Sequence, residues 1–161
     1  MVILNSSPVI HLTAALGGLE LLPTLYGRVL VPVEVKRELE SGADRDDAAL
    51  RLLAVSGIEI HTLATGIPPL LAGELDLGEA AVIALALDLP GATVVLDDLK
   101  ARHVARRDGI AFTGSLGVLL YAKRCGKLHS IAAAVERIRE HGAWLSDALV
   151  DRALILAGEK S

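Results

Sequence analysis

Two consecutive aspartates, Asp97 and Asp98, end the apolar segment Thr93-Val94-Val95-Leu96 and are the first candidates for chemistry in this chain. Carboxylates held side by side repel each other and lose solvation unless a cation or water compensates them. A hard divalent ion such as Mg²⁺ or Mn²⁺ would supply that compensation. The alternative is structural, with Asp97 capping a helix that begins near Leu99 and Asp98 stabilising its positive end. Both interpretations fit an isolated aspartate pair.

Polar residues also follow two other apolar segments. Asn5-Ser6-Ser7 comes after Val2-Ile3-Leu4, and Thr113-Gly114-Ser115 comes after Ile110-Ala111-Phe112. If these segments are parallel strands, their carboxyl ends meet at one edge of the sheet, which is where open α/β sheets bind ligands. The sequence therefore predicts a polar site at that edge, shared with the aspartate pair.

Two glutamates have both a functional and a structural interpretation. Glu79 follows Leu77-Gly78 at the start of an apolar helical segment, where the helix macrodipole favours a carboxylate. Glu38 lies on a helix after the second strand, where it can pair with Lys36 or Arg37 in solvent. Neither glutamate alone indicates a site.

Several other chemistries find no support in the residue pattern. The histidines are scattered without metal-ligand spacing, and no Ser/His/Asp or Cys/His arrangement accompanies them, so nucleophilic catalysis is not expected. Neither Gly17-Gly18 nor the glycines at 114 and 117 match a Walker A sequence or a dinucleotide fingerprint. ATP and NAD chemistry are therefore not expected either.

The elements that must position these residues alternate along the chain. Short β-branched or apolar runs predict strands at 2–4, 28–31, 58–60, 93–96 and 110–113, the third of them at a sheet edge. Helices are predicted at 7–16, 19–25, 32–39, 46–56, 79–89, 100–107, 116–125, 131–141 and from 147 onward, with a loop and a helical turn over 65–76. This order predicts one α/β domain over residues 1–161 with a mostly parallel sheet.

Three of these helices carry more specific predictions. Ser7 is expected to cap the first helix, with Pro8 in its first turn. The inward face of the helix over 46–56 is predicted to carry Leu50, Leu53 and Ala54. Ser146 is expected to cap the last helix, with Leu149, Ala153 and Leu156 facing inward.

Composition narrows the class of protein. The 161 residues are 52% hydrophobic and 22% charged, which is enough for a core and excludes a disordered chain. The lone Cys125 excludes a disulfide framework, so we expect a cytoplasmic protein. The apolar runs are too short for a membrane span, and the N-terminus does not resemble a signal peptide.

The charge distribution bears on nucleic-acid binding. The net charge of −4 argues against a protein that coats nucleic acid by bulk positive charge. Between positions 99 and 130, however, the lysines and arginines are opposed only by Asp108. Aromatic residues make up only 2% of the chain, so we expect contacts with nucleic acid to rest on phosphates and metal rather than on base stacking.

Taken in order, the pieces resemble a PIN domain. They run from Asn5-Ser6-Ser7-Pro8 through Glu38-Leu39 and Gly78-Glu79 to Leu96-Asp97-Asp98-Leu99-Lys100-Ala101-Arg102. The closing stretch from Thr113 to Lys123 fits the same pattern, so the match covers roughly residues 2 to 150. Within this family the chain is similar to the branch related to VapC-type toxins.

The resemblance implies a three-layer α/β/α fold and a metal-dependent endoribonuclease. Clustered carboxylates would hold one or two Mg²⁺ or Mn²⁺ ions, and hydrolysis would leave a 5′-phosphate and a 3′-hydroxyl. The implied catalytic and metal-binding positions are Asn5, Glu38, Glu79 and Asp98, with Asp97 adjacent. Supporting roles at the metal or the phosphate fall to Ser7, Thr113 and Ser115, and contacts with RNA phosphates to Arg102, Arg106 and Lys123.

One position departs from the family pattern, since Asn5 stands where nuclease-active PIN domains have aspartate. The amide oxygen of Asn5 can bind a metal but brings no charge, which lowers the expected metal affinity unless Asp97 replaces the charge. Three hypotheses follow: a ribonuclease toxin whose antitoxin covers the acidic cleft, a non-catalytic RNA- or protein-binding module, and a regulatory domain without a nucleic-acid role. The resemblance and the high apolar content also suggest a homodimer, with the last helix as one candidate surface.

Overall fold

The computed structural model describes residues 1–42 and 48–160. Its sheet has five strands, all parallel, in the order β3-β2-β1-β4-β5. The strands are β1 (Val2–Leu4), β2 (Val29–Pro32), β3 (Ile58–His61), β4 (Thr93–Val95) and β5 (Ala111–Thr113). The α/β prediction is therefore confirmed, and β3 lies at the sheet edge as predicted.

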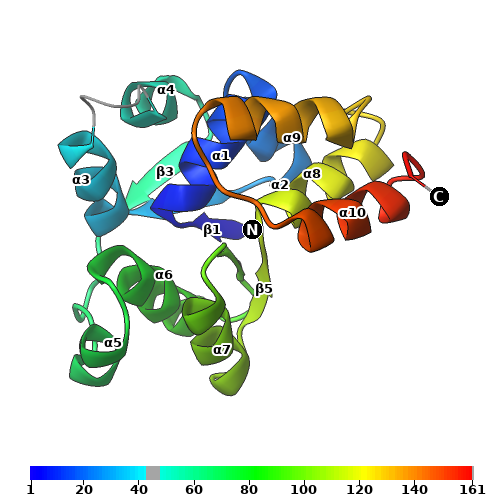
Figure 1. Ribbon diagram of the computed structural model, residues 1–161. Coiled ribbons are helices and arrows are strands. Elements are labelled where there is room, and N and C mark those ends of the chain that lie inside the picture. The colour runs from blue at the N-terminus through cyan, green and yellow to red at the C-terminus, as the bar shows by residue number, and fades with distance from the viewer. Residues whose placement is uncertain (43–47, 161) are drawn as a thin grey trace.

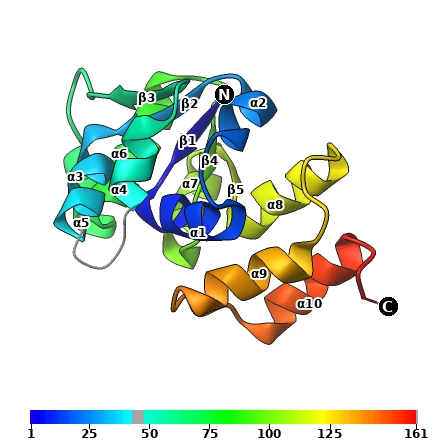
Figure 2. The same cartoon turned by 90° about the horizontal axis from the view of Figure 1, so that it is seen from above.

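Helices cover both faces of this sheet. They are α1 (Ser6–Leu16), α2 (Leu21–Tyr26), α3 (Val33–Ser41), α4 (Ala48–Ala54), α5 (Pro69–Glu74), α6 (Leu77–Asp88), α7 (Leu99–Arg107), α8 (Ser115–Arg124), α9 (Ile131–Glu140) and α10 (Asp147–Leu156). In Figure 1, α5, α6 and α7 lie on one side of the sheet, and α1, with α9 beside it, lies on the other. Figure 2 shows α9 and α10 as a pair packed beside α1 and α8.

The inner strands are buried from both sides, which explains their continuous apolar sequences. Ile3, Leu30 and Val94 are fully buried in the centre of the core. In the parallel register, Leu4 pairs with Val95, and Val95 pairs with Thr113. The segments that follow β1, β4 and β5 therefore leave the sheet at the same edge, where the sequence places its polar residues.

Helix caps differ from the sequence prediction at two places. Helix α1 has Asn5 at its N-cap instead of Ser7, so Pro8 is the third residue of the helix, where a backbone N–H needs no partner within the helix. Asp98, not Asp97, caps α7, because its Oδ1 accepts the N–H groups of Lys100 at 2.7 Å and Ala101 at 3.0 Å. At this edge of the sheet, the Asp98 carboxylate therefore caps a helix, whereas the Asn5 side chain makes no capping hydrogen bond.

Two helices turn a different face toward the core than the sequence predicts. In α4, Leu53 and Ala54 are exposed and Leu52 is buried, while Asp46 and the side chain of Leu50 lie outside the described residues. Periodicity in so short a helix does not distinguish neighbouring faces.

In α10 the Ser146 cap and the buried Ala153 are confirmed. Leu149 and Leu156, however, are 43% and 68% exposed, because α10 packs on α8 and α9 through Val150 and Ala153 instead. No helix in the described part of the chain is both long and apolar enough to span a bilayer.

Candidate active site

Asn5 presents a buried oxygen toward the carboxyl edge of the sheet. The residue occupies the N-cap of α1, yet its side chain makes no capping hydrogen bond. The Oδ1 atom is buried and has no donor among the described residues. An unsatisfied buried oxygen costs about 1–3 kcal/mol, and such groups call for a ligand or ion that completes them.

Glu38 approaches the same oxygen at the start of α6. A Cβ atom added to Gly78 would lie 2.5 Å from Glu38 Oε2 and 3.1 Å from Asn5 Oδ1. The hydrogen atom at Gly78 therefore leaves space that these two oxygens from α3 and α1 share. This close approach explains why glycine precedes Glu79 in the sequence.

Glu79 and Asp98 bring two further carboxylates to this edge. The pKa of Glu79 is raised, first by burial, then by the negative charge of Asp98 and more weakly by Asp76 and Glu38. A hydrogen bond from the Asp76 N–H to Glu79 Oε2, at 3.4 Å, opposes this rise. Glu79 and Asp98 line a cavity of about 160 Å³ together with Lys100.

These four positions suit a hard cation in their chemistry. All of their donors are oxygens, the type that Mg²⁺ and Mn²⁺ prefer, and the repulsion that raises the pKa of Glu79 is what a bound cation would relieve. Among residues 1–42 and 48–160, no three His, Cys, Asp or Glu side chains are grouped closely enough to enclose one ion. The four residues therefore form an open arrangement of oxygen ligands, in which only the Asn5 side chain is uncharged.

Asp97 has a different environment from Asp98. Its Oδ2 accepts hydrogen bonds from His11 Nδ1 at 2.8 Å and from Ser115 Oγ at 2.5 Å, and its Oδ1 accepts the Ser115 N–H at 2.8 Å. Burial opposes ionisation, but these hydrogen bonds outweigh it and lower the pKa of Asp97. Both oxygens are thus occupied by the protein, and the carboxylate joins the end of β4 to α1 and α8.

Arg102 completes this network around Asp97. Its Nε donates to the Leu96 carbonyl at 2.7 Å, and its Nη2 lies 3.6 Å from Asp97 Oδ1. A Cβ atom on Gly114 would overlap the guanidinium, so the glycine makes room for it. The structure therefore places Arg102 in an internal contact beside the site.

The remaining predicted residues are spread more widely. Ser7 is exposed and lines a cavity with Glu38, whereas Thr113 ends β5 and contacts Gly117. Arg106 is exposed on α7 with its guanidinium carbon 5.3 Å from the centre of the Phe112 ring. Lys123 lies apart from the acidic edge, because its Nζ pairs with Glu159 Oε1 at 2.6 Å.

Sequence reasoning missed two contributors to this edge, Asp76 and His11, and did not give Gly78 a role of its own. Asp76 supplies both the N–H and part of the charge that act on Glu79, and its place at the N-cap of α6 was the only available signal. His11 gave no signal, because its partner Asp97 is 86 positions away in the chain. Gly78 could be recognised only as part of the family pattern.

A comparison with models of protein families shows to which family this chain belongs. Residues 1–159 match the family model DUF3368, described as a PIN domain. The chain belongs to the PIN domain family. PIN domains are generally nucleases and typically use divalent metals, which agrees with an oxygen-rich edge on a parallel sheet. Neither the curated proteins nor the solved structures provide a match to this PIN domain.

Proposed function

We propose that this PIN domain is a metal-dependent endoribonuclease and the toxin component of a toxin–antitoxin pair. The observation that supports it is the convergence of Asn5, Glu38, Glu79 and Asp98, from four separate helix starts or faces, at the carboxyl edge of the sheet. These are the positions at which the sequence resembles the family's acidic motif. Asn5 Oδ1 is buried without a donor among the described residues, so it is available to a ligand.

Each residue of the cluster would supply an oxygen ligand in this proposal. Glu38, Glu79 and the free Oδ2 of Asp98 would hold Mg²⁺ or Mn²⁺, and Asn5 would add its amide oxygen. When bound, the ion lowers the pKa of a water ligand and offsets negative charge on the phosphodiester. The Asp98 carboxylate is held in place by the Lys100 and Ala101 N–H groups, so it is oriented before any ligand arrives.

Basic and hydroxyl side chains near the cluster would bind the RNA backbone. Lys100 lines the cavity that contains Glu79 and Asp98, which puts a positive charge beside the acidic cluster. Arg106 is exposed further along α7, and Ser7 shares a cavity with Glu38. Such contacts position a strand without reading its sequence.

The alternative function is a PIN-like module that binds RNA or a protein without cleaving RNA. The neutral side chain of Asn5 favours it, because the cluster then has one carboxylate fewer than the family pattern. The open arrangement of the remaining acids favours it as well. Metal binding and cleavage separate the two functions. An antitoxin partner, a homodimer and a cytoplasmic location stay predictions from the sequence.

The test is cleavage of end-labelled RNAs by protein freed of any copurifying partner, with Mn²⁺, Mg²⁺ or EDTA. Wild type is compared with Glu79→Gln and Asp98→Asn, and the second variant keeps its helix cap because asparagine caps as well as aspartate. Glu136→Gln on the exposed side of α9 is the matched control. We expect metal-dependent cleavage by wild type and the control, and a loss of about 100-fold or more in the two site variants. Absence of cleavage by wild type on every RNA would instead favour the binding module.

A further inference from the structure

A third cavity lies next to the acidic cluster of Glu38, Glu79 and Asp98 with Asn5, and it has a different character. It has a volume of about 520 Å³ and lies between the start of α7, the first turns of α8 and the face of α10. Its apolar lining includes Leu99, Leu149 and Leu156, which are exposed by 69%, 43% and 68%. We call it the α7–α10 groove. Its size is that of pockets for small organic ligands.

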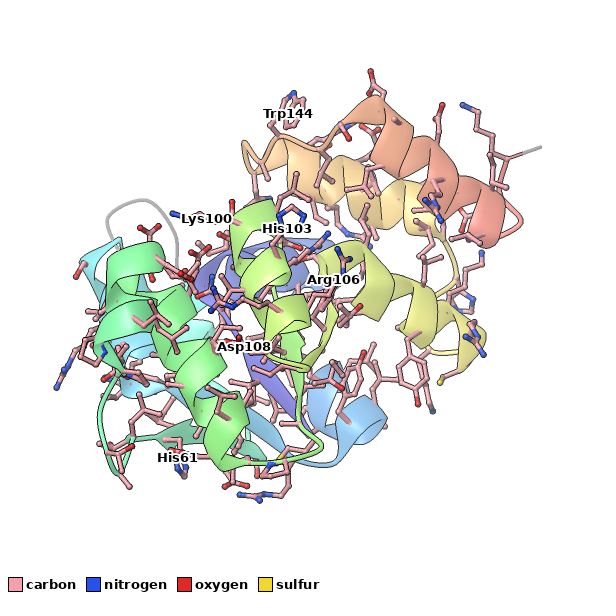
Figure 3. All side chains as sticks on the ribbon, turned by 90° about the horizontal axis from the view of Figure 1, so that it is seen from below. His61, Lys100, His103, Arg106, Asp108 and Trp144 are labelled. Carbon is pink, nitrogen blue, oxygen red and sulfur yellow. The ribbon has the colours of Figure 1, made fainter. Side chains whose placement is uncertain are left out.

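The only tryptophan of the chain lines this groove. Trp144 lies on the connection between α9 and α10 with 85% of its surface exposed. Figure 3 shows it beyond the end of α9, with Lys100, His103 and Arg106 along α7. A flat aromatic ring in water beside exposed leucines is a surface on which another planar group can stack.

The polar groups of the groove carry more positive than negative charge. Asp97 is the only acidic residue among the described residues that line it, and His11, Ser115 and Arg102 surround that carboxylate. Arg152 also lines the groove, and among the described residues no carboxylate pairs with it.

The two acidic residues of α10 form ion pairs with cations that do not line the groove. Asp147 pairs with Arg139 at 2.8 Å, and Asp151 pairs with Lys160 at 2.7 Å. Arg152 is therefore the charge on α10 that remains available to an anion in the groove.

The groove and the acidic cluster are joined by consecutive residues. Asp97 lines the groove while Asp98 lines the acidic cavity, and Leu99 lines the groove while Lys100 lines the acidic cavity. Both cavities therefore border the same short segment, so a nucleic-acid strand with a phosphate at the acidic cluster is close enough to extend into the groove. This continuity favours a nucleotide over a protein segment, which would need no such connection.

We propose that the α7–α10 groove binds the base and phosphate of an RNA nucleotide adjacent to the cleaved bond. The base stacks on Trp144 against the leucines, and the phosphate lies at Arg152. The proposal rests on the proposed function, because it is RNA at the acidic cluster that brings a nucleotide to the groove. It differs from the expectation drawn from the low aromatic content, because the proposal gives the single exposed indole of Trp144 a stacking role.

The test measures binding without cleavage. A 2′-O-methyl RNA oligonucleotide of about eight nucleotides is titrated in EDTA, and its binding is followed by the fluorescence of the single tryptophan and by the anisotropy of a label on the RNA. The variants are Trp144→Ala, Trp144→Phe and Arg152→Gln. Arg124→Gln, at the far end of α8, is the charge-matched control. Sedimentation of each variant reports its oligomeric state.

We expect the oligonucleotide to quench Trp144 in the wild type and the control. Trp144→Ala should weaken binding about tenfold, and Trp144→Phe should retain most of it because phenylalanine still stacks. Arg152→Gln should weaken binding several-fold more than Arg124→Gln does.

Two results would overturn the groove proposal. One is RNA binding without quenching and without an effect of the Trp144 and Arg152 variants. The other is a dimer that Trp144→Ala converts to a monomer while RNA affinity stays the same, which would make the groove an interface between two copies. Because EDTA removes metal chemistry, loss of cleavage with quenching intact would count against the ribonuclease and not against the groove.

Discussion

Asn5 is the residue at which a change of charge would test the proposed metal site most directly. Its amide oxygen lies beside the Glu38 carboxylate, where an aspartate would add a further negative charge. We expect Asn5→Asp to bind Mn²⁺ about tenfold more tightly and to cleave RNA faster, because ligand charge governs affinity for hard cations. Isothermal titration with Mn²⁺ measures the first effect.

The same substitution has a cost without metal. A buried carboxylate next to Glu38 is repelled, so we expect the melting temperature of Asn5→Asp in EDTA to fall by about 2–6 °C and to recover when Mn²⁺ is added. Asn5→Ala, which lacks both charge and oxygen, should show no such recovery. Equal Mn²⁺ affinities for all three proteins would remove Asn5 from the site.

Gly78 links the packing of α6 to the positions of Glu38 and Asn5, two of the proposed metal ligands. In Gly78→Ala, the new methyl group would meet the end of the Glu38 side chain, which is flexible and can move aside. Folding stability should therefore change by less than about 1 kcal/mol, since alanine is also the better helix former. Displacement of Glu38 should nevertheless lower cleavage about 100-fold.

Gly73 in α5 provides a control for this prediction. A Cβ atom added there meets nothing within 4 Å, so Gly73→Ala should leave both stability and cleavage nearly unchanged. Thermal melts and RNA cleavage rates on both variants make the comparison. Full activity in Gly78→Ala would show that the position of Glu38 is unimportant.

At the scale of elements, Asp97 joins four segments of the fold. Its carboxylate binds His11 of α1 and Ser115 of α8, and lies near Arg102 of α7 at the end of β4. We expect Asp97→Asn to destabilise the domain by about 2 kcal/mol, because it removes charged hydrogen bonds from a mostly buried network. Asp147→Asn, at a 92% exposed carboxylate, should cost less than about 0.5 kcal/mol. Equal urea midpoints for the two variants would contradict this role.

Glu159 ties the end of the chain to α8 and α9, and it makes stability depend on pH. Burial disfavours its charge, but hydrogen bonds from Lys123, the Ala132 and Ile131 N–H groups and Ser130 outweigh this and lower its pKa to about 2. A lowered carboxyl pKa stabilises the fold above the ordinary value near 4.5 and loses that effect as the pH falls toward 2.

Glu159→Gln should therefore cost about 1–2 kcal/mol at pH 7, an amount reduced by solvent screening. The difference from wild type should shrink steadily between about pH 4.5 and pH 2. Urea unfolding at several pH values measures it. A difference that does not depend on pH would mean that Glu159 acts through packing and not through its charge.

At the scale of the whole molecule, the sheet could be predicted because the apolar sequence of each inner strand by itself indicates burial on both faces. Val29-Leu30-Val31 and Thr93-Val94-Val95 are short, β-branched and mostly apolar runs, which are typical of strands covered on both faces. Helix faces were harder to predict. Leu149 and Leu156 fit an inward stripe by spacing, but the surface that α10 meets is formed by α8 and α9, which the sequence of α10 does not encode.

The site could be predicted only where a motif carries its residues. Glu38, Glu79 and Asp98 are separated by tens of residues, and each alone has an ordinary structural interpretation. Their convergence depends on the packing of α3 and α7 against α6. The opposite environments of Asp97 and Asp98 could not be predicted, because they are set by His11 and Ser115 from distant helices.

The net charge of the whole molecule predicts how strongly its affinity for RNA depends on salt. The chain carries −4 overall, while lysines and arginines dominate residues 99–130 and several of them, including Arg102 and Lys123, are engaged within the protein. Few cations remain to replace counterions on the nucleic acid. We expect about two to four phosphates to be neutralised, so log affinity should fall with log salt at a slope of about −1.5 to −3.

Titration of the 2′-O-methyl oligonucleotide in EDTA, from about 50 to about 300 mM salt, tests this slope. A slope steeper than about −5 would require a basic surface that this molecule does not display in its described residues, and a slope near zero would mean that phosphate contacts do not hold the strand at all.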